Sequence, residues 1–251
     1  MSLIITQISS HGIIHATDSN LTSGNGSFAR QDKKLFPVPF LNAALTVAGS
    51  YNVGVQQMNV WMEGFIQTQH EGNVDSLGAF ARALAKSLET AMTPEQKASG
   101  SIIHIAGYEK DSEGFHPEFW FVRNIYGIDT ETGEYKDVRE TFQISEDFWM
   151  RDWKENKLAK DFEQGGYQIY INGFTSGRIS FWLFQSQMTN FFWQIWSNHA
   201  WEFRPPNSIE ESKLIVDLYI RTIGVLFSLS DYTAPFIGGT PQLYAIPKPI
   251  N

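Results

Sequence analysis

The stretch that most constrains the fold of this chain is its beginning, from Ser2 to Lys34. Two apolar runs, residues 3–8 and 13–16, are separated by a polar turn that ends in glycine. Short apolar runs on either side of such a turn predict a β-hairpin. The second run leads to a carboxylate, Asp18, and after a loop rich in Gly, Asn and Ser the chain reaches Lys34 at the head of another apolar run.

The residue types in this stretch suggest a nucleophilic site. If Met1 is removed, the chain begins with Ser2, whose hydroxyl then lies beside its own α-amine. An α-amine has an ordinary pKa of about 8, so it can act as a general base near neutral pH. A neighbouring lysine ammonium favours the neutral amine, and an aspartate can hold that lysine in place. Ser2, Asp18 and Lys34 are therefore candidate catalytic residues.

The spacing of these residues resembles that of a known family. Ser2, Gly12, Asp18-Ser19 and Lys34 resemble, without a gap, the nucleophile, turn glycine, Asp-Ser pair and catalytic lysine of proteasome β-subunits and related bacterial N-terminal nucleophile hydrolases. Taken singly, each is an ordinary turn or surface residue, and their joint spacing carries the resemblance. The likeness is strongest over residues 2–92 and returns over 208–246.

The resemblance implies a fold and an activity. The expected fold is α+β, a four-layer α-β-β-α sandwich, in a single domain over residues 1–251. The expected activity is hydrolysis of an amide or peptide bond by the N-terminal residue, with a peptide or small amide as substrate. The family likeness also implies self-association into a ring or another homo-oligomer.

Two further site residues come from the resemblance. Gly49 follows a predicted buried strand at residues 43–48, where the family has a glycine whose backbone N–H binds the oxyanion. Without the resemblance, Gly49 is an ordinary turn between a strand and a helix. Ser176, or alternatively Thr175, corresponds to a family serine that supports the N-terminal amine, although Phe174 and a longer turn break that pattern.

The family pattern fails before the turn at Gly238-Gly239. Where the family places an Asp and a Ser that support the amine, this chain has Ala234 and Ile237, and Asp231 comes three residues too early. Losing such supporting groups lowers catalytic rates. The alternative function is therefore a catalytically inactive subunit that serves as an assembly or binding scaffold.

The rest of the chain alternates between helix and strand patterns. Apolar residues recur at helical spacing over residues 55–66, 77–88 and 209–229, and the last of these helices is expected to be largely buried. Residues 178–203 hold many large aromatic side chains, which favours a subunit interface. Residues 128–160 fit two interpretations, an insertion at the rim of a pocket or an amphipathic surface helix. Strands are predicted at residues 101–108, 115–125, 166–177 and 243–246.

Composition excludes several classes of function. The net charge is −8 without a Lys/Arg cluster, which argues against nucleic acid as a partner. The absence of cysteine excludes disulfides and thiol nucleophiles, and the six histidines lack the spacing of a metal site. No apolar run is long enough to span a membrane, and the start lacks a signal-peptide pattern. We therefore expect a cytoplasmic protein without a metal, a cofactor or a membrane partner.

Overall fold

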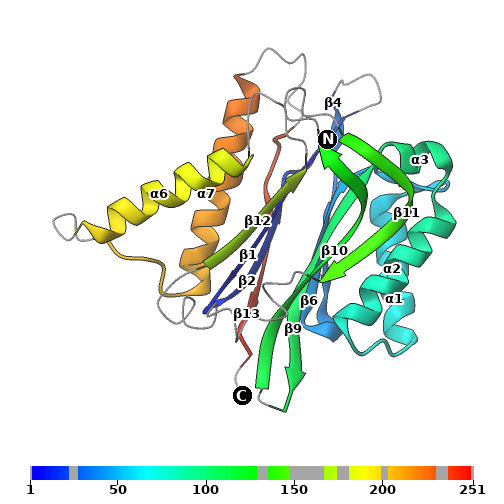
Figure 1. Ribbon diagram of the computed structural model, residues 1–251, viewed down its shortest axis with the longest axis horizontal. Helices are drawn as coiled ribbons and strands as arrows, with labels where there is room; N and C mark the ends of the chain where they lie inside the picture. The colour runs from blue at the N-terminus through cyan, green and yellow to red at the C-terminus, as the bar shows by residue number, and fades with distance from the viewer. Residues whose placement is uncertain are drawn as a thin grey trace.

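The computed structural model describes residues 2–22, 28–112, 114–128, 135–146, 167–173, 181–198, 203–229 and 237–249 (Figure 1). The α-helices in these ranges are α1 (Met58–Glu71), α2 (Leu77–Ala91), α3 (Pro94–Ala98), α6 (Phe181–Ser197) and α7 (Ile209–Ser228). A single 3-10 turn, η1, spans Pro39–Leu41. No helix in the described part of the chain has both the length and the apolar character needed to cross a membrane.

Four strands form a sheet in the order β12-β1-β2-β13. They are β1 (Leu3–Ser9), β2 (Gly12–Thr17), β12 (Tyr167–Gly173) and β13 (Gln242–Pro247). β1 and β2 form the predicted hairpin, in which Ser9 pairs with Gly12 next to the turn. The predicted closing strand is β13, which pairs with β2. The beginning and the end of the chain therefore lie side by side in one sheet.

The two faces of β1 meet different neighbours because side chains alternate along a strand. Leu3 and Ile5 belong to an apolar cluster with side chains of α7. Ile4 and Ile8 belong to clusters that include residues of β6 and β9. Every residue of β1 is consequently buried.

Five strands form the second sheet, in the order β11-β10-β9-β6-β5. They are β5 (Leu35–Val38), β6 (Ala43–Gly49), β9 (Ser101–Asp111), β10 (Gly114–Ile128) and β11 (Tyr135–Glu146). Helices α1 and α2 contribute Met62, Phe65 and Phe80 to the apolar cluster that covers this sheet. Ser76 caps α2, because its side chain accepts a hydrogen bond from Ala79 N–H at 3.3 Å.

The surface-helix interpretation of residues 128–160 is wrong over the part that the structure describes. Tyr135–Glu146 is an edge strand, β11, paired with β10. Phe142 is buried against the α2 side of the sheet, and its N–H donates to the Glu89 carboxylate at 2.7 Å. Residues 129–134 and 147–166 lie outside the described residues.

Two expectations about the helices also need correction. Val55, which the periodicity assigned to a buried helix face, precedes α1 and is fully exposed. Helix α7 was expected to be largely buried, yet five of its apolar residues or immediate neighbours are exposed. These are Leu214, Leu218, Val225, Leu226 and Leu229. Apolar residues on three sides of a helix therefore do not show that all three sides are covered.

The predicted four-layer α-β-β-α sandwich is contradicted by the structure. Of the described residues, 44% lie in mostly antiparallel strands and 36% in helices, and the strands divide into four separate sheets. The two additional sheets pair β3 (Asn20–Thr22) with β4 (Phe28–Gln31), and β7 (Asn52–Val53) with β8 (Gln56–Gln57). The physical reason is local: after β2 the chain leaves the four-stranded sheet, and its backbone groups find partners in the separate hairpin of β3 and β4.

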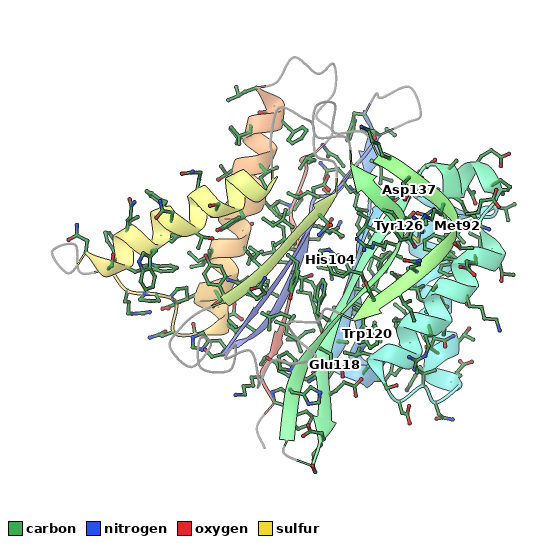
Figure 2. All side chains as sticks on the ribbon, viewed as in Figure 1. Met92, His104, Glu118, Trp120, Tyr126 and Asp137 are labelled. Atoms are coloured by element: carbon green, nitrogen blue, oxygen red, sulfur yellow. The ribbon has the colours of Figure 1, made fainter. Side chains whose placement is uncertain are left out.

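A buried polar chain joins the two larger sheets at their centre, where His104 lies (Figure 2). The Thr6 hydroxyl is 3.3 Å from His15 Nδ1 and 3.1 Å from His104 Nδ1, and His15 Nε2 is 3.2 Å from Ala106 O. Ala106 O can only accept, so His15 Nε2 carries its proton. Nδ1 of His15 then accepts from Thr6, and Thr6 accepts from His104. Both histidines are neutral in this arrangement.

This polar chain predicts an acid-sensitive stability. Burial lowers the pKa of His15 to about 4 and holds that of His104 well below its usual range. A lowered histidine pKa means that the unfolded chain binds the proton first, so stability falls as pH drops from 6.5 toward 4. His15 alone should account for about 3 kcal/mol over that window. Urea unfolding of wild type and His15→Gln at several pH values checks this, and parallel pH profiles would contradict it.

Candidate functional site

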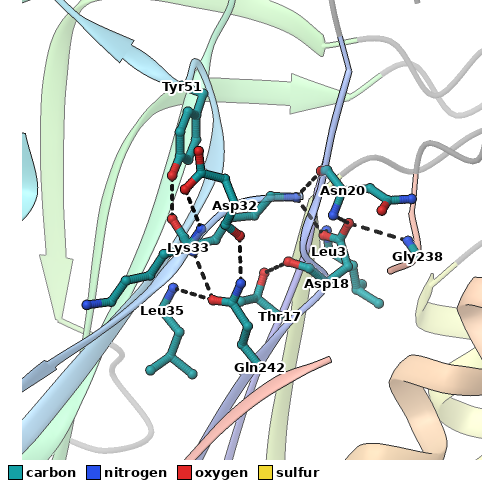
Figure 3. A network of polar contacts seen from close by, with 11 residues as sticks. Leu3, Thr17, Asp18, Asn20, Asp32, Lys33, Leu35, Tyr51, Gly238 and Gln242 are labelled. Carbon is teal, nitrogen blue, oxygen red and sulfur yellow. Dashed lines mark hydrogen bonds and ion pairs between the residues drawn. The ribbon is translucent and has the colours of Figure 1, made fainter. Parts of the chain in front are cut away.

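Asp18 directly follows the last residue of β2, and its carboxylate is buried and bound by four donors. Oδ1 accepts from Leu3 N–H at 2.8 Å and from Lys34 Nζ at 3.0 Å. Oδ2 accepts from Asn20 N–H at 3.1 Å and from Gly238 N–H at 3.4 Å (Figure 3). The donors come from the start of β1, from β3, from the head of β5 and from the turn before β13, so this carboxylate ties four segments together.

Lys34 is fully buried although it is a lysine. Its ammonium donates to Asp18 Oδ1 and to the carbonyl oxygen of Asn20. An ammonium has three donors, and these contacts use two of them. The predicted pairing of Lys34 with Asp18 is therefore confirmed, and one N–H of Lys34 remains for another acceptor.

Burial sets the electrostatics of this pair. It raises the pKa of the Asp18 carboxyl, against the opposing effects of the Lys34 ammonium and of the Leu3 and Gly238 backbone donors. Burial also lowers the pKa of the Lys34 ammonium, while Asp18 opposes that shift. The two pKa values move toward each other, which makes proton exchange with a neighbouring group less costly than in water.

Ser2 lies at the same end of β1 as this pair. Its neighbour Leu3 donates to the Asp18 oxygen that also binds Lys34. On its other side, β1 pairs with β12, whose last residue Gly173 lies opposite Leu3. A Cβ on Gly173 would overlap the carbonyl oxygen of Ser2, so glycine is required for this close approach. Ser2 itself is 3% exposed.

Gly49, the predicted oxyanion donor, ends β6 with a φ of 118°. Two residues earlier, Val47 N–H donates to Lys34 O at 3.0 Å. Because N–H groups two residues apart on a strand point to the same edge, Gly49 N–H is directed to the edge on which Lys34 lies. A Cβ at Gly49 would lie 2.7 Å from Ser101 Cα, so no other residue fits here without a shift.

Three residues at positions of the family pattern lie outside the described residues, namely Ser176, Asp231 and Ala234. Ile237 is fully buried within the apolar cluster that includes Leu3 and Ile5. Its side chain therefore gives the start of β1 apolar packing where the family has a polar group.

Three residues of the network were missed by the sequence interpretation. Asn20 supplies a carbonyl to Lys34, Gly238 supplies an N–H to Asp18, and Gln242 binds the backbone on both sides of Lys34. For Gly238, the Gly238-Gly239 pair in the sequence already indicated a turn. Asn20 acts through its backbone and Gln242 lies 208 residues from Lys34, so no local pattern could reveal them.

A cavity of about 640 Å³ borders the network. It is lined by Asn20 and Gly238, by Phe28 and Gln31 of β4, and by residues of α7. A molecule bound there would touch the segments that support Asp18. Among the residues described, no three His, Asp or Glu side chains gather closely enough to hold a metal ion.

No protein-family model matches the sequence, and no curated protein matches it either. Any assignment of function must therefore come from the residues of the site itself.

Proposed function

We propose that this protein hydrolyses an amide or peptide bond with Ser2 as an N-terminal nucleophile, after removal of Met1. The observation that carries this proposal is the buried Lys34–Asp18 ion pair, 3.0 Å long, whose Asp18 oxygen also binds the residue next to Ser2. Lys34 is buried, its pKa is lowered, and it lies near the start of β1, which Ser2 precedes. Burying a lysine costs free energy, so this arrangement favours a functional role over a purely structural one.

The proposed reaction has two halves. In the first, Ser2 Oγ attacks the substrate carbonyl carbon, and its proton passes to the α-amine of Ser2. Gly49 N–H stabilises the oxyanion of the tetrahedral intermediate. The C–N bond then breaks, the α-amine returns the proton to the leaving amine, and an ester to Ser2 remains. In the second half, water attacks that ester, which releases the acid and restores the hydroxyl.

Lys34 acts on this reaction through its charge. Its ammonium is shielded from water, so its field acts strongly on groups near the start of β1. A positive charge there favours the neutral α-amine, which is the form that can accept the proton. Asp18 holds the ammonium in place, and the donors from Asn20 and Gly238 hold Asp18.

Covalent labelling of Ser2 tests the proposal. The protein is released from a cleavable N-terminal fusion so that Ser2 is the first residue, and it is incubated with a peptide β-lactone that acylates nucleophilic hydroxyls. We expect one adduct by intact mass, mapped to Ser2, and none in Ser2→Ala. A matched sample that keeps Met1 should also stay unlabelled, because its Ser2 nitrogen is an amide and cannot act as a base. An unlabelled Ser2-initiated protein would reject the proposal.

The second candidate function is a catalytically inactive scaffold subunit, and two observations favour it. Ser2 is buried, and Ile237 occupies apolar packing where an amine-supporting group was expected. Exposed apolar side chains on α6 and α7 suit self-association with a second copy of the chain. They include Phe191, Trp193, Leu214 and Val225. A scaffold predicts a homo-oligomer by light scattering together with no labelling of Ser2.

A further inference from the structure

The segment that carries Lys34 into the site, residues 32–35, is hydrogen bonded along most of its backbone. Four of its backbone groups form hydrogen bonds with residues of this segment or of neighbouring elements. They are Asp32 N–H to Ser19 O at 2.9 Å, Lys33 N–H to Asp32 Oδ1 at 2.8 Å, Tyr51 O–H to Lys33 O at 2.6 Å and Val47 N–H to Lys34 O at 3.0 Å. This segment is therefore held with little freedom of movement.

Three further backbone groups are all bound by one side chain, the amide of Gln242 (Figure 3). Its Oε1 accepts from Lys34 N–H at 2.9 Å and from Leu35 N–H at 3.2 Å. Its Nε2 donates to Asp32 O at 2.6 Å. Two acceptor bonds and one donor bond on adjacent peptide groups require an amide, because a carboxylate lacks the donor and a hydroxyl is too short.

The place of Gln242 in the fold gives these bonds a consequence. Gln242 begins β13 and pairs with Thr17, the residue before Asp18. The segment that it binds leads into β5, which belongs to the five-stranded sheet. One side chain therefore fixes the backbone of Lys34 relative to the strand that carries Asp18, across two separate sheets.

We propose that Gln242 is a positioning residue, which holds residues 32–35 so that Lys34 Nζ meets Asp18 beside the start of β1. Its effect on catalysis rests on the function proposed above, whereas its effect on the ion pair does not. Without the amide, three backbone groups lose their partners and the lysine segment can shift. A displacement of about 1 Å at a catalytic group can cost about a hundredfold in rate.

Two variants and a control test this role. Gln242→Met keeps the length of the side chain and removes all three hydrogen bonds. Gln242→Glu keeps the acceptor for Lys34 and Leu35 but loses the donor for Asp32 O. Gln168→Met makes the same change in β12 of the same sheet, at another half-buried glutamine. The first readout is the titration of the Asp18 carboxyl by ¹³C NMR, in protein that keeps Met1 and so does not depend on Ser2 chemistry.

In Gln242→Met we expect the titration midpoint of Asp18 to rise by about one pH unit, because a displaced Lys34 no longer favours the carboxylate. The second readout is the rate of Ser2 acylation in Ser2-initiated protein, which should fall about a hundredfold in Gln242→Met. The rate should fall less in Gln242→Glu and stay unchanged in Gln168→Met.

An unchanged Asp18 midpoint in Gln242→Met would overturn the proposal, whatever the acylation rate. A raised midpoint in a protein that is never acylated would support the positioning of the ion pair and reject the hydrolase function instead. If Gln242→Met does not fold, the same comparison is made with Gln242→Glu, which keeps two of the three bonds. Its Asp18 midpoint must then differ from that of wild type and of Gln168→Met.

Discussion

Replacing Lys34 with methionine should destabilise the protein by about 3 kcal/mol or more at neutral pH, because a buried carboxylate then loses its charged partner. Asp18 keeps only its three backbone donors, from Leu3, Asn20 and Gly238. Acylation of Ser2 in Ser2-initiated protein should fall by about a hundredfold or more, since the charge that favours the neutral amine is gone. Urea unfolding and intact mass measure the two effects.

The neighbouring residue provides the control. Lys33 is exposed and pairs with exposed Glu63 at 2.6 Å, so Lys33→Met should change stability by about 1 kcal/mol at most. The deficit of Lys34→Met should also shrink in acid. Losing Lys34 raises the pKa of Asp18 in the folded state, and a raised carboxyl pKa favours folding as the pH falls. Equal effects of the two substitutions would show that the buried pair has no special role.

The second large effect is expected at Gly173. A methyl group there would overlap the Ser2 carbonyl and lie 3.1 Å from Leu3 Cα, and φ at Gly173 is 125°, a backbone conformation that alanine rarely adopts. Strain and displacement of β1 together should cost about 2–4 kcal/mol in Gly173→Ala. Because the start of β1 moves, Ser2 acylation should fall as well. Thermal unfolding and the labelling rate measure both.

Gly64 in α1 is the matched control for this substitution. A methyl group at Gly64 meets no atom within 4 Å, and alanine favours a helix, so Gly64→Ala should stabilise the protein by up to about 1 kcal/mol. A Gly173→Ala protein as stable as wild type would mean that the close approach to Ser2 is not needed.

Some of this structure could be predicted from the sequence because the signals are local. The hairpin and the pairing of Asp18 with Lys34 both follow from patterns within the first 34 residues. The strand Tyr135–Glu146 was missed because its charged residues hid the alternation, and only pairing with β10 explains it. The predicted fold class was wrong because the separation of β3 and β4 from the four-stranded sheet depends on where the chain turns after Asp18.

The supporting contacts of the site could not be predicted for a different reason. Gln242 is one glutamine at the start of a strand, and nothing near it in sequence distinguishes it from Gln168. Its three hydrogen bonds arise only once β13 pairs with β2. The exposed side of α7 was likewise missed, since apolar composition does not show whether a neighbour covers it.

In the proposed reaction, the buried ammonium of Lys34 makes the freed amine of Ser2 a base near neutral pH. The most direct test is the rate of Ser2 acylation as a function of pH in Ser2-initiated protein. We expect this rate to rise with pH to a plateau, with a midpoint below the ordinary α-amine value of about 8. A midpoint at or above that value would contradict it.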